Sequence, residues 1–481
     1  MANLTETVPA DTMTEAEKKR KGWRVLLFGV LSNFSIGILY TWSNLKDILE
    51  YRSVRYAEGV ARAADAADRL YKEWDISQLS WPYAYGGFAS AFIVVLAGWL
   101  QDRLGPTKVI FAGILMVGGG AILCSFFTHQ PLMFTIVFTM LVGNGIGFVY
   151  ACPRAAAMKW FHPSKKGLVN GLVVAGFGLG ALWLAPLEIF FLKQLNWSFE
   201  QTLRVLGTLI LILGSVAAFN VVNPPAGYHY PELPVDPNKP VKENMKKTAS
   251  IGLGSMVKHY QTWMLFFIYA FYCSAGAMVI SNASDIMRVQ GGGEDGPYGA
   301  TVKALVSVMV VVASISNATG RSLGGIVSDK IGRKPTYYII HTIQAINMFM
   351  FHNYTTPTMI FIGTIITCVA YGTVMSTTPS LVADYWGLKS YGANYGVVYT
   401  GWGLSLIIGP TIAQFSKKHV LEGIKNGVPG VDMTQSYHIA YYAAIGLIAI
   451  SFVLAYLVKK PKFKQSEVVD DYILSPEETR A

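Results

Sequence analysis

The chain has 481 residues, of which 52% are hydrophobic and only 14% are charged. A soluble domain usually carries about 25% charged residues, so this chain has too few to cover a surface in contact with water. Apolar stretches of about 18 or more residues recur along the chain, which is typical of helical proteins that cross a membrane many times. The formal net charge of +10 is explained by basic loops on one membrane face, and we expect no nucleic-acid partner.

Twelve apolar segments are long enough to cross a bilayer, and because strand-like alternation is absent, we expect them to be helices. They lie near residues 23–47, 80–100, 107–127, 132–156, 166–191, 202–223, 261–284, 302–328, 335–352, 357–382, 391–415 and 437–459. A polar segment rich in Pro and Lys divides them into two groups of six. The predicted organisation is a tail at 1–22, a first bundle at 23–223 with an outer helical insertion at 50–77, a linker at 224–260, a second bundle at 261–459 and a tail at 460–481.

The Lys and Arg residues of the loops indicate the orientation, because cytoplasmic loops are enriched in both. If both termini and the linker are cytoplasmic, about 24 Lys and Arg residues lie inside and about 13 outside. The basic cluster Lys18–Lys21 fits this placement, and no cleavable signal peptide is evident before the first span. We expect a monomeric, multi-pass protein of the cell membrane (the inner membrane in a bacterium), embedded in the lipid bilayer.

The two halves of the chain repeat each other. "GWLQDRLGPTK" (Gly98–Lys108) matches "GIVSDKIGRKP" (Gly325–Pro335) at an offset of 227 residues. "PRAAAMKWF" and "GLVVAGFGLGALW" have similar counterparts in the second half, "PSLVADYWG" and "GVVYTGWGLSLII", at offsets of 226 and 225 residues. The constant order and offset predict a duplicated six-helix unit, with a substrate path between the halves near the bilayer midplane.

The repeated loops resemble the signature G-x-L-x-D-R-x-G-R-K that joins helices 2 and 3, and again helices 8 and 9, in the major facilitator superfamily. The resemblance implies an all-α membrane protein with twelve transmembrane helices in two pseudo-symmetric six-helix bundles. It also implies that Asp102, Arg103, Asp329 and Arg333 form ion pairs at the cytoplasmic mouth and act in gating. Alternatively, the basic residues of these loops only anchor the topology.

"GILYTWS", "GIGFVYACPRAAAMKWF", "GLVVAGFGLGA" and "NYGVVYTGWGLSLIIGP" resemble the oxalate:formate antiporter family, which is related to the monocarboxylate transporters. The resemblance covers nearly the whole chain apart from the tails and the segment 50–77. It implies a carrier of small carboxylates that needs no cofactor or metal. A carrier-derived sensor, which binds without transport, is the alternative from another class, and an enzyme is disfavoured because no nucleophile–base pair or metal cluster appears in the sequence.

Arg321 is the only formally charged residue between Lys303 and Asp329. Eight residues before Asp329, it lies about 12 Å inside the cytoplasmic end of its helix, near the middle of a hydrocarbon core about 30 Å thick. A central Arg costs about 2.5–3.5 kcal/mol, so it should face a cavity or a partner. No Asp or Glu stands in the middle of another span, and the guanidinium matches a carboxylate bidentately. We therefore expect it to bind an anionic substrate.

The family resemblance extends this site to other side chains. In related monocarboxylate carriers the Arg of helix 8 anchors the carboxylate, with an acidic or amide residue one turn earlier, where this chain has Asn317. Tyr150 matches a tyrosine that faces the substrate. Tyr40, Tyr399 and, more weakly, Asn33 are further candidates to line the site, although tyrosines at helical spacing commonly serve packing.

Trp402 stands where the oxalate transporter of this family has a lysine in helix 11. A buried dianion needs two cations and a monoanion needs one, so the substitution favours lactate, pyruvate or formate over oxalate. Arg154 is a candidate second cation, but its closeness to Lys159 favours snorkelling to the cytoplasm. An oxalate:formate antiporter remains the alternative.

Coupling to protons needs a group that titrates. His341 and, if it is buried, Asp285 are the candidates in the sequence. If neither acts, the chain would exchange anions without a proton site. The sequence leaves symport and antiport open.

Overall fold

The computed structural model describes residues 13–46, 49, 74–161, 166–225, 228, 249–293, 295–387 and 390–469. Nearly all of the predicted insertion at 50–77, most of the predicted linker and much of both predicted tails lie outside these residues. The first half contains α1 (Glu15–Ser35), η2 (Gly37–Leu39), η4 (Ile76–Ser80), α3 (Trp81–Leu104), α4 (Pro106–Cys124), α5 (Pro131–Val137), η5 (Phe138–Gly143), α6 (Asn144–Met158), α7 (Lys166–Gly178), α8 (Ala181–Ile189), η7 (Phe190–Gln194) and α9 (Phe199–Ala218). The second half contains α10 (Leu253–Met256), α11 (Tyr260–Gln290), α12 (Gly299–Ile331), α13 (Arg333–Phe351), α14 (Pro357–Trp386), α15 (Tyr391–Lys425), η8 (Met433–Gln435), α16 (His438–Leu457) and η9 (Gln465–Glu467).

The described residues include eleven segments that are long and apolar enough to cross a membrane. The ninth predicted span, 335–352, corresponds to α13, which is not among the eleven. This helix buries His341, Gln344 and Asn347, and these polar residues make it less apolar than its neighbours. It packs against α14 and α16 and completes the second group of six, so the prediction of an all-α membrane fold is confirmed.

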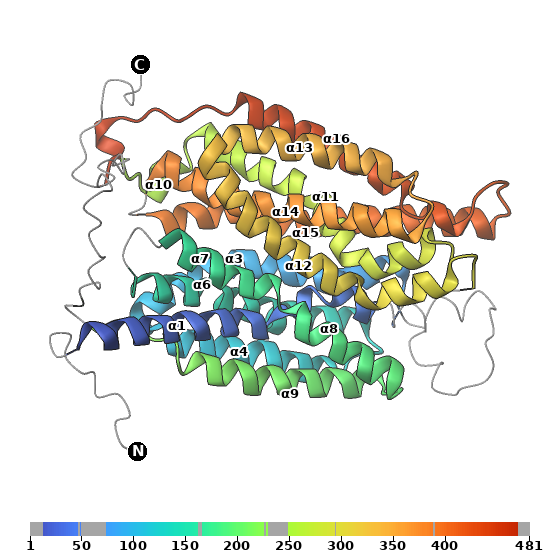
Figure 1. Ribbon diagram of the computed structural model, residues 1–481, viewed down its shortest axis with the longest axis horizontal. Helices are drawn as coiled ribbons and strands as arrows, with labels where there is room; N and C mark the ends of the chain where they lie inside the picture. The colour runs from blue at the N-terminus through green and yellow to red at the C-terminus, as the bar shows by residue number, and fades with distance from the viewer. Residues whose placement is uncertain are drawn as a thin grey trace.

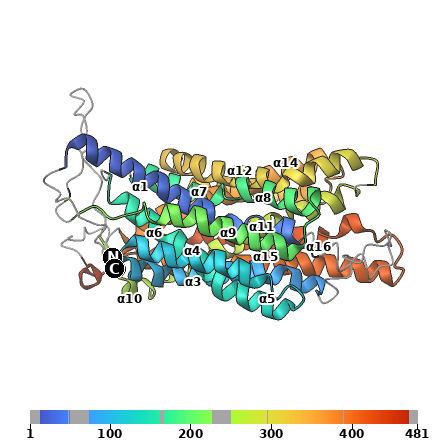
Figure 2. The same cartoon turned by 90° about the horizontal axis from the view of Figure 1, so that it is seen from below.

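The two groups of helices lie side by side along the long axis of the molecule (Figure 1). The halves meet through α3 against α15 and through α7 and α8 against α12, and Figure 2 shows the same elongated bundle from below. The start of α1 and the segment around η9 lie at the same end of the molecule, at the left in Figure 1. Helices from both halves therefore line the interface between the two groups.

Several helices extend beyond the predicted spans. α1 begins at Glu15, inside the predicted tail, because Thr14 and Glu17 cap each other's backbone N–H groups. α11 and α15 continue to Gln290 and Lys425, past the ends predicted at 284 and 415. Asp285 of α11 and Lys417 of α15 lie beyond the predicted ends and pair with each other inside the protein, so both helices are still buried at these residues.

The repeated loops have the same backbone conformation in both halves. Gly105 separates α3 from α4 with a φ of 82°, and Gly332 separates α12 from α13 with a φ of 96°. These positive φ values favour glycine, so the repeat preserves the two residues that let each helix turn sharply into the next.

Candidate functional site

Two helices of the first half are interrupted at the same level. The helix of α1 gives way to the single turn η2 and resumes at Trp42, while α7 and α8 are separated by Leu179 and Gly180. The interruptions touch each other: a Cβ atom added to Gly180 would lie 2.5 Å from the Cα of Gly37. Glycine at both positions allows this backbone contact, which places Tyr40 at the centre of the molecule.

Arg321 on α12 lies beside this crossing and is 5% exposed. Its Nη2 donates to the Tyr40 hydroxyl at 2.8 Å, its Nε to the Asn317 side-chain oxygen at 3.1 Å, and its Nη1 to the Val174 carbonyl at 3.4 Å. Asn317 also donates to Tyr40 at 3.2 Å. Within the described part of the chain all these partners are neutral, so the guanidinium is bound by hydrogen bonds and keeps an uncompensated positive charge.

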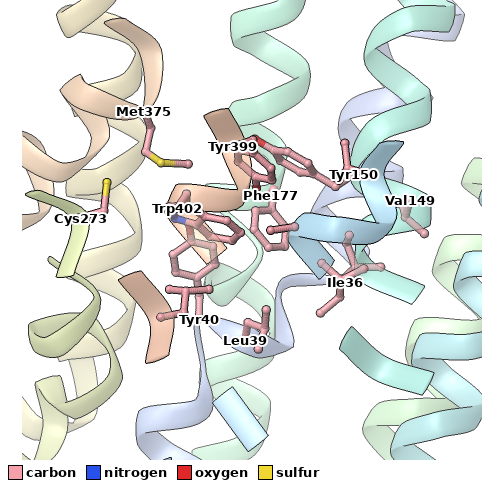
Figure 3. Close-up of a cluster of buried hydrophobic side chains, with 14 of the residues drawn as sticks. Ile36, Leu39, Tyr40, Val149, Tyr150, Phe177, Cys273, Met375, Tyr399 and Trp402 are labelled. Atoms are coloured by element: carbon pink, nitrogen blue, oxygen red, sulfur yellow. The ribbon is translucent and has the colours of Figure 1, made fainter. Parts of the chain in front are cut away.

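Tyr40, which bonds to Arg321, belongs to a buried cluster of aromatic rings from both halves (Figure 3). The ring centroid of Phe177 lies 5.1 Å from that of Tyr40 and 5.3 Å from that of Tyr150. Tyr150 stacks on Tyr399 of the second half at 5.7 Å, and Tyr399 stacks on Trp402 at 4.8 Å. The structure therefore brings Arg321, Asn317, Tyr40, Tyr150, Tyr399 and Trp402 together, as expected from the sequence.

Trp402 donates from its indole nitrogen to the Tyr371 hydroxyl at 2.5 Å. Tyr371 belongs to α14, so it ties the aromatic cluster to the helix packed directly behind Arg321. The tight packing is visible at Gly372, where an added Cβ would lie 2.1 Å from the Asn317 carbonyl oxygen. Tyr371 and Phe177 were not predicted, and nothing in their helical spacing separates them from tyrosines and phenylalanines that only pack.

The aromatic row continues along α15. Tyr391 stacks on Tyr395 at 5.8 Å, and Tyr395 contacts Tyr399 at 5.4 Å. Because these residues are spaced by four, they share one helix face. The row leads from Trp402 to the first residue of α15, at the end of the molecule that carries the repeated loops.

Arg154 is placed differently from the favoured expectation. Its guanidinium carbon lies 4.7 Å from the ring centroid of Tyr150, in a cation–π arrangement, rather than pointing away from the site towards the cytoplasm. The nearby Tyr150 ring holds it because the helix α6 places residues four apart on one face. A second cation therefore approaches the aromatic cluster.

Three predicted residues bond to groups other than Arg321. Asn33 donates to the Val173 carbonyl at 2.9 Å and joins α1 to α7. His341 contacts the Tyr337 carbonyl at 2.7 Å and the Ser451 hydroxyl at 2.8 Å, within the packing of α13 against α16. The third residue, Asp285, belongs to a separate polar cluster.

This outer polar cluster lies at the end opposite the repeated loops. Lys417 donates to Asp285 at 2.7 Å, and these side chains are 1% and 4% exposed. Tyr437 also donates to Asp285, while Lys46 from the first half donates to Asn282 of α11. The cluster joins both halves, and apart from Asp285 its members were not predicted, because the contacts between them join helices that are distant in the sequence.

The predicted gating residues lie at the other end of the molecule. Arg333 pairs with Asp329 at 2.5 Å and with Asp384 of α14 at 3.0 Å, so an ion pair forms in the second repeated loop. Arg103 instead lies over the Trp99 ring at 4.0 Å. The side chain of Asp102 lies outside the described residues.

Comparisons with known proteins bear on the family and the fold. The sequence pattern of the Major Facilitator Superfamily matches residues 22–410 and 265–471. The chain is 25% identical over 329 residues to the oxalate:formate antiporter of Oxalobacter formigenes, covering 65% of this chain and 69% of that protein. It is 28% identical over 215 residues to apicoplast pyruvate carrier 1 of Toxoplasma gondii, covering 40% of this chain and 39% of that protein.

The fold is also similar to a solved structure. A bacterial homologue of the human lysosomal transporter Spinster, in an inward-facing and unoccupied conformation, aligns with a TM-score of 0.61 and 13% identity. The alignment covers 92% of this chain and 96% of that chain. At this identity the likeness concerns the fold alone, and it supports the arrangement of two six-helix bundles.

Proposed function

Since the chain belongs to the major facilitator superfamily, we propose that it is a secondary active transporter that carries small carboxylate anions by alternating access. The observation that carries this proposal is the environment of Arg321: a buried cation between the two halves, bonded only to neutral groups among the described residues. A carboxylate would supply the missing negative charge and match the planar guanidinium. The names of the antiporter and the pyruvate carrier similar to this chain support the same class of substrate.

The preferred cargo is a monocarboxylate such as lactate, pyruvate or formate. Trp402 fills part of the site with an indole ring, and one buried cation offsets one negative charge. The Tyr150 and Tyr399 hydroxyls provide donors for the second carboxylate oxygen. Transport occurs by proton symport or anion exchange.

Oxalate is the second candidate, and the position of Arg154 favours it. Its guanidinium lies over Tyr150, one of the rings around Arg321, so a small movement of this ring would bring two cations to one ligand. This alternative makes the chain an oxalate:formate antiporter. The relative affinities for oxalate and formate distinguish the two candidates.

The proposal includes the topology and the transport cycle. We place the protein in the cell membrane (the inner membrane in a bacterium), with both termini in the cytoplasm and the bundles divided at the linker 224–260. The protein would function as a monomer. The Arg333 ion pairs at the cytoplasmic mouth would strengthen and weaken as the halves rock.

Uptake into proteoliposomes tests the proposal. Labelled lactate, pyruvate, formate and oxalate are each offered with and without internal counter-anion. Arg321→Ala should weaken binding by about 2 kcal/mol or more, which is about thirtyfold or more. Arg204→Ala is the matched control, because Arg204 bonds to Ser125 on the periphery of the first half. Normal uptake by a folded Arg321→Ala protein would contradict the proposed site.

A further inference from the structure

Glu188 is a buried acid that the proposed site does not use. It lies on α8, is 0% exposed, and is nearer the end of the molecule opposite the repeated loops. Building on the proposed function, we propose that Glu188 binds the proton that crosses the membrane together with the carboxylate. The inference rests on its hydrogen bonds, on the lack of a cation beside it, and on its connection to Tyr40.

The partners of Glu188 are two neutral side chains from the first span. The Thr41 hydroxyl lies 2.5 Å from one carboxyl oxygen, and the Asn44 amide nitrogen lies 3.4 Å from the other. Among the described residues, no Lys or Arg nitrogen lies within 4.0 Å of this carboxyl group. An ionised carboxylate buried in this way would be costly, and a bound proton removes the charge.

The charged and titratable groups on the surrounding elements are engaged elsewhere. Lys46 bonds to Asn282, Arg321 bonds to Tyr40, and Lys303 is exposed at the start of α12. At the far end of α12, Asp329 pairs with Arg333 and Lys330 is exposed. The side chain of Lys193, in η7, lies outside the described residues. On α11, Asp285 pairs with Lys417.

A count of hydrogens supports a protonated carboxyl. The Thr41 hydroxyl oxygen lies 3.1 Å from the Ile38 carbonyl as well as 2.5 Å from Glu188. A hydroxyl has one proton to donate, so it cannot donate to both oxygen atoms. Both contacts become hydrogen bonds when Glu188 carries a proton and donates it to Thr41, while Thr41 donates to Ile38.

Glu188 is linked to the carboxylate site through consecutive residues. Tyr40 accepts from Arg321 at 2.8 Å, and Thr41, the next residue, contacts Glu188. Both belong to the interrupted stretch of the first span. A carboxylate that displaces Tyr40 from Arg321 therefore moves the residue beside the proton site, and loss of the proton changes the position of Tyr40.

Asn44 connects the same acid to the second half. Its side-chain oxygen accepts from Ser284 Oγ at 3.1 Å, and Ser43 Oγ accepts from Ser284 N at 3.0 Å. When the halves separate at this end, these bonds break and water reaches Glu188, where the carboxyl exchanges its proton. When they close, a protonated Glu188 is neutral and a bound monoanion neutralises Arg321. After the anion has left and Glu188 has released its proton, the charges of Glu188 and Arg321 sum to zero, so both forms that reorient carry the same net charge.

The test uses the full chain in proteoliposomes with labelled pyruvate. A pH gradient of one unit, acid outside, drives about tenfold accumulation when one proton accompanies one monoanion. The parent protein should reach this ratio, whereas Glu188→Gln, which mimics the protonated acid, should retain pyruvate–pyruvate exchange but accumulate none. Glu422→Gln is the control, because Glu422 is exposed near the end of α15 and the same acid-to-amide change there should leave accumulation unchanged.

The outcomes separate this inference from the proposed function. Accumulation by Glu188→Gln at the parent level would overturn the inference, and so would a parent that exchanges pyruvate without any response to the pH gradient; in both cases carboxylate transport itself would stand. If the parent protein transports no carboxylate, both the inference about Glu188 and the proposed function are refuted. If Glu188→Gln does not fold, Glu188→Asp should keep coupling with a shifted pH profile, and an unshifted profile counts against Glu188. Infrared difference spectra should show a protonated carboxylic acid in the parent that Glu188→Gln lacks, and its absence would also overturn the inference.

Discussion

Replacing Gly180 with alanine tests whether the crossing of the two interrupted helices positions the site. The added Cβ would lie 2.5 Å from the Cα of Gly37, whereas non-bonded carbon atoms prefer about 3.5–4.0 Å. Rotamer changes cannot relieve this contact, because both groups belong to the backbone. The two segments must therefore separate by about 1–1.5 Å, and Tyr40 and Thr41 move with the first span.

The expected effects follow from this displacement. Overpacking costs about 1–3 kcal/mol of stability, and a misplacement of about 1 Å at a functional group can reduce activity about a hundredfold. The assays are thermal unfolding in detergent and pyruvate uptake into proteoliposomes. Gly171→Ala is the matched control, because a Cβ at this position on α7 meets nothing within 4 Å. Parent-like stability and uptake in Gly180→Ala would refute the reasoning.

Two other substitutions test the charges of the site and of the outer polar cluster. Trp402→Lys should place a second cation near Arg321 and shift preference from formate towards oxalate by about tenfold or more, measured by competition for uptake; an unchanged preference would refute the role assigned to Trp402. Lys417→Met should destabilise the protein by about 3–5 kcal/mol, measured by denaturation, because it leaves Asp285 buried beside an apolar side chain. Lys418→Met is the control, since Lys418 is exposed and 3.9 Å from its partner, and equal losses in the two variants would contradict this account.

The sequence predicted the fold, and it predicted the neighbourhood of Arg321 in the candidate site, for a physical reason. Long apolar segments can only be helices in lipid, and an isolated Arg321 in such a segment needs a polar neighbourhood. The spacing of four residues placed Asn317 beside it, as the structure shows. The helical spacing and the cost of a charge in an apolar segment therefore pointed to Arg321 and Asn317.

The other residues of the candidate site are brought together by contacts between helices that are distant in the sequence. The chain has 26 tyrosines, and spacing does not show which of them, such as Tyr371, faces the centre. Arg154 was expected to snorkel because Lys159 is near in sequence, but the position of Tyr150 decides its direction. Glu188 was not predicted as a site residue, since the interruption that brings Thr41 to it is a tertiary feature.

The aromatic row on α15 has a consequence for leakage. Tyr391, Tyr395, Tyr399 and Trp402 contact one another in sequence, and each ring is held by its neighbours. A single ring cannot swing aside without disturbing the next, so the rings restrict one another's motion. Under the proposed alternating access, this row would form an inner barrier that opens by movement of α15 as a whole and stays closed to formate-sized ions and water between transport events.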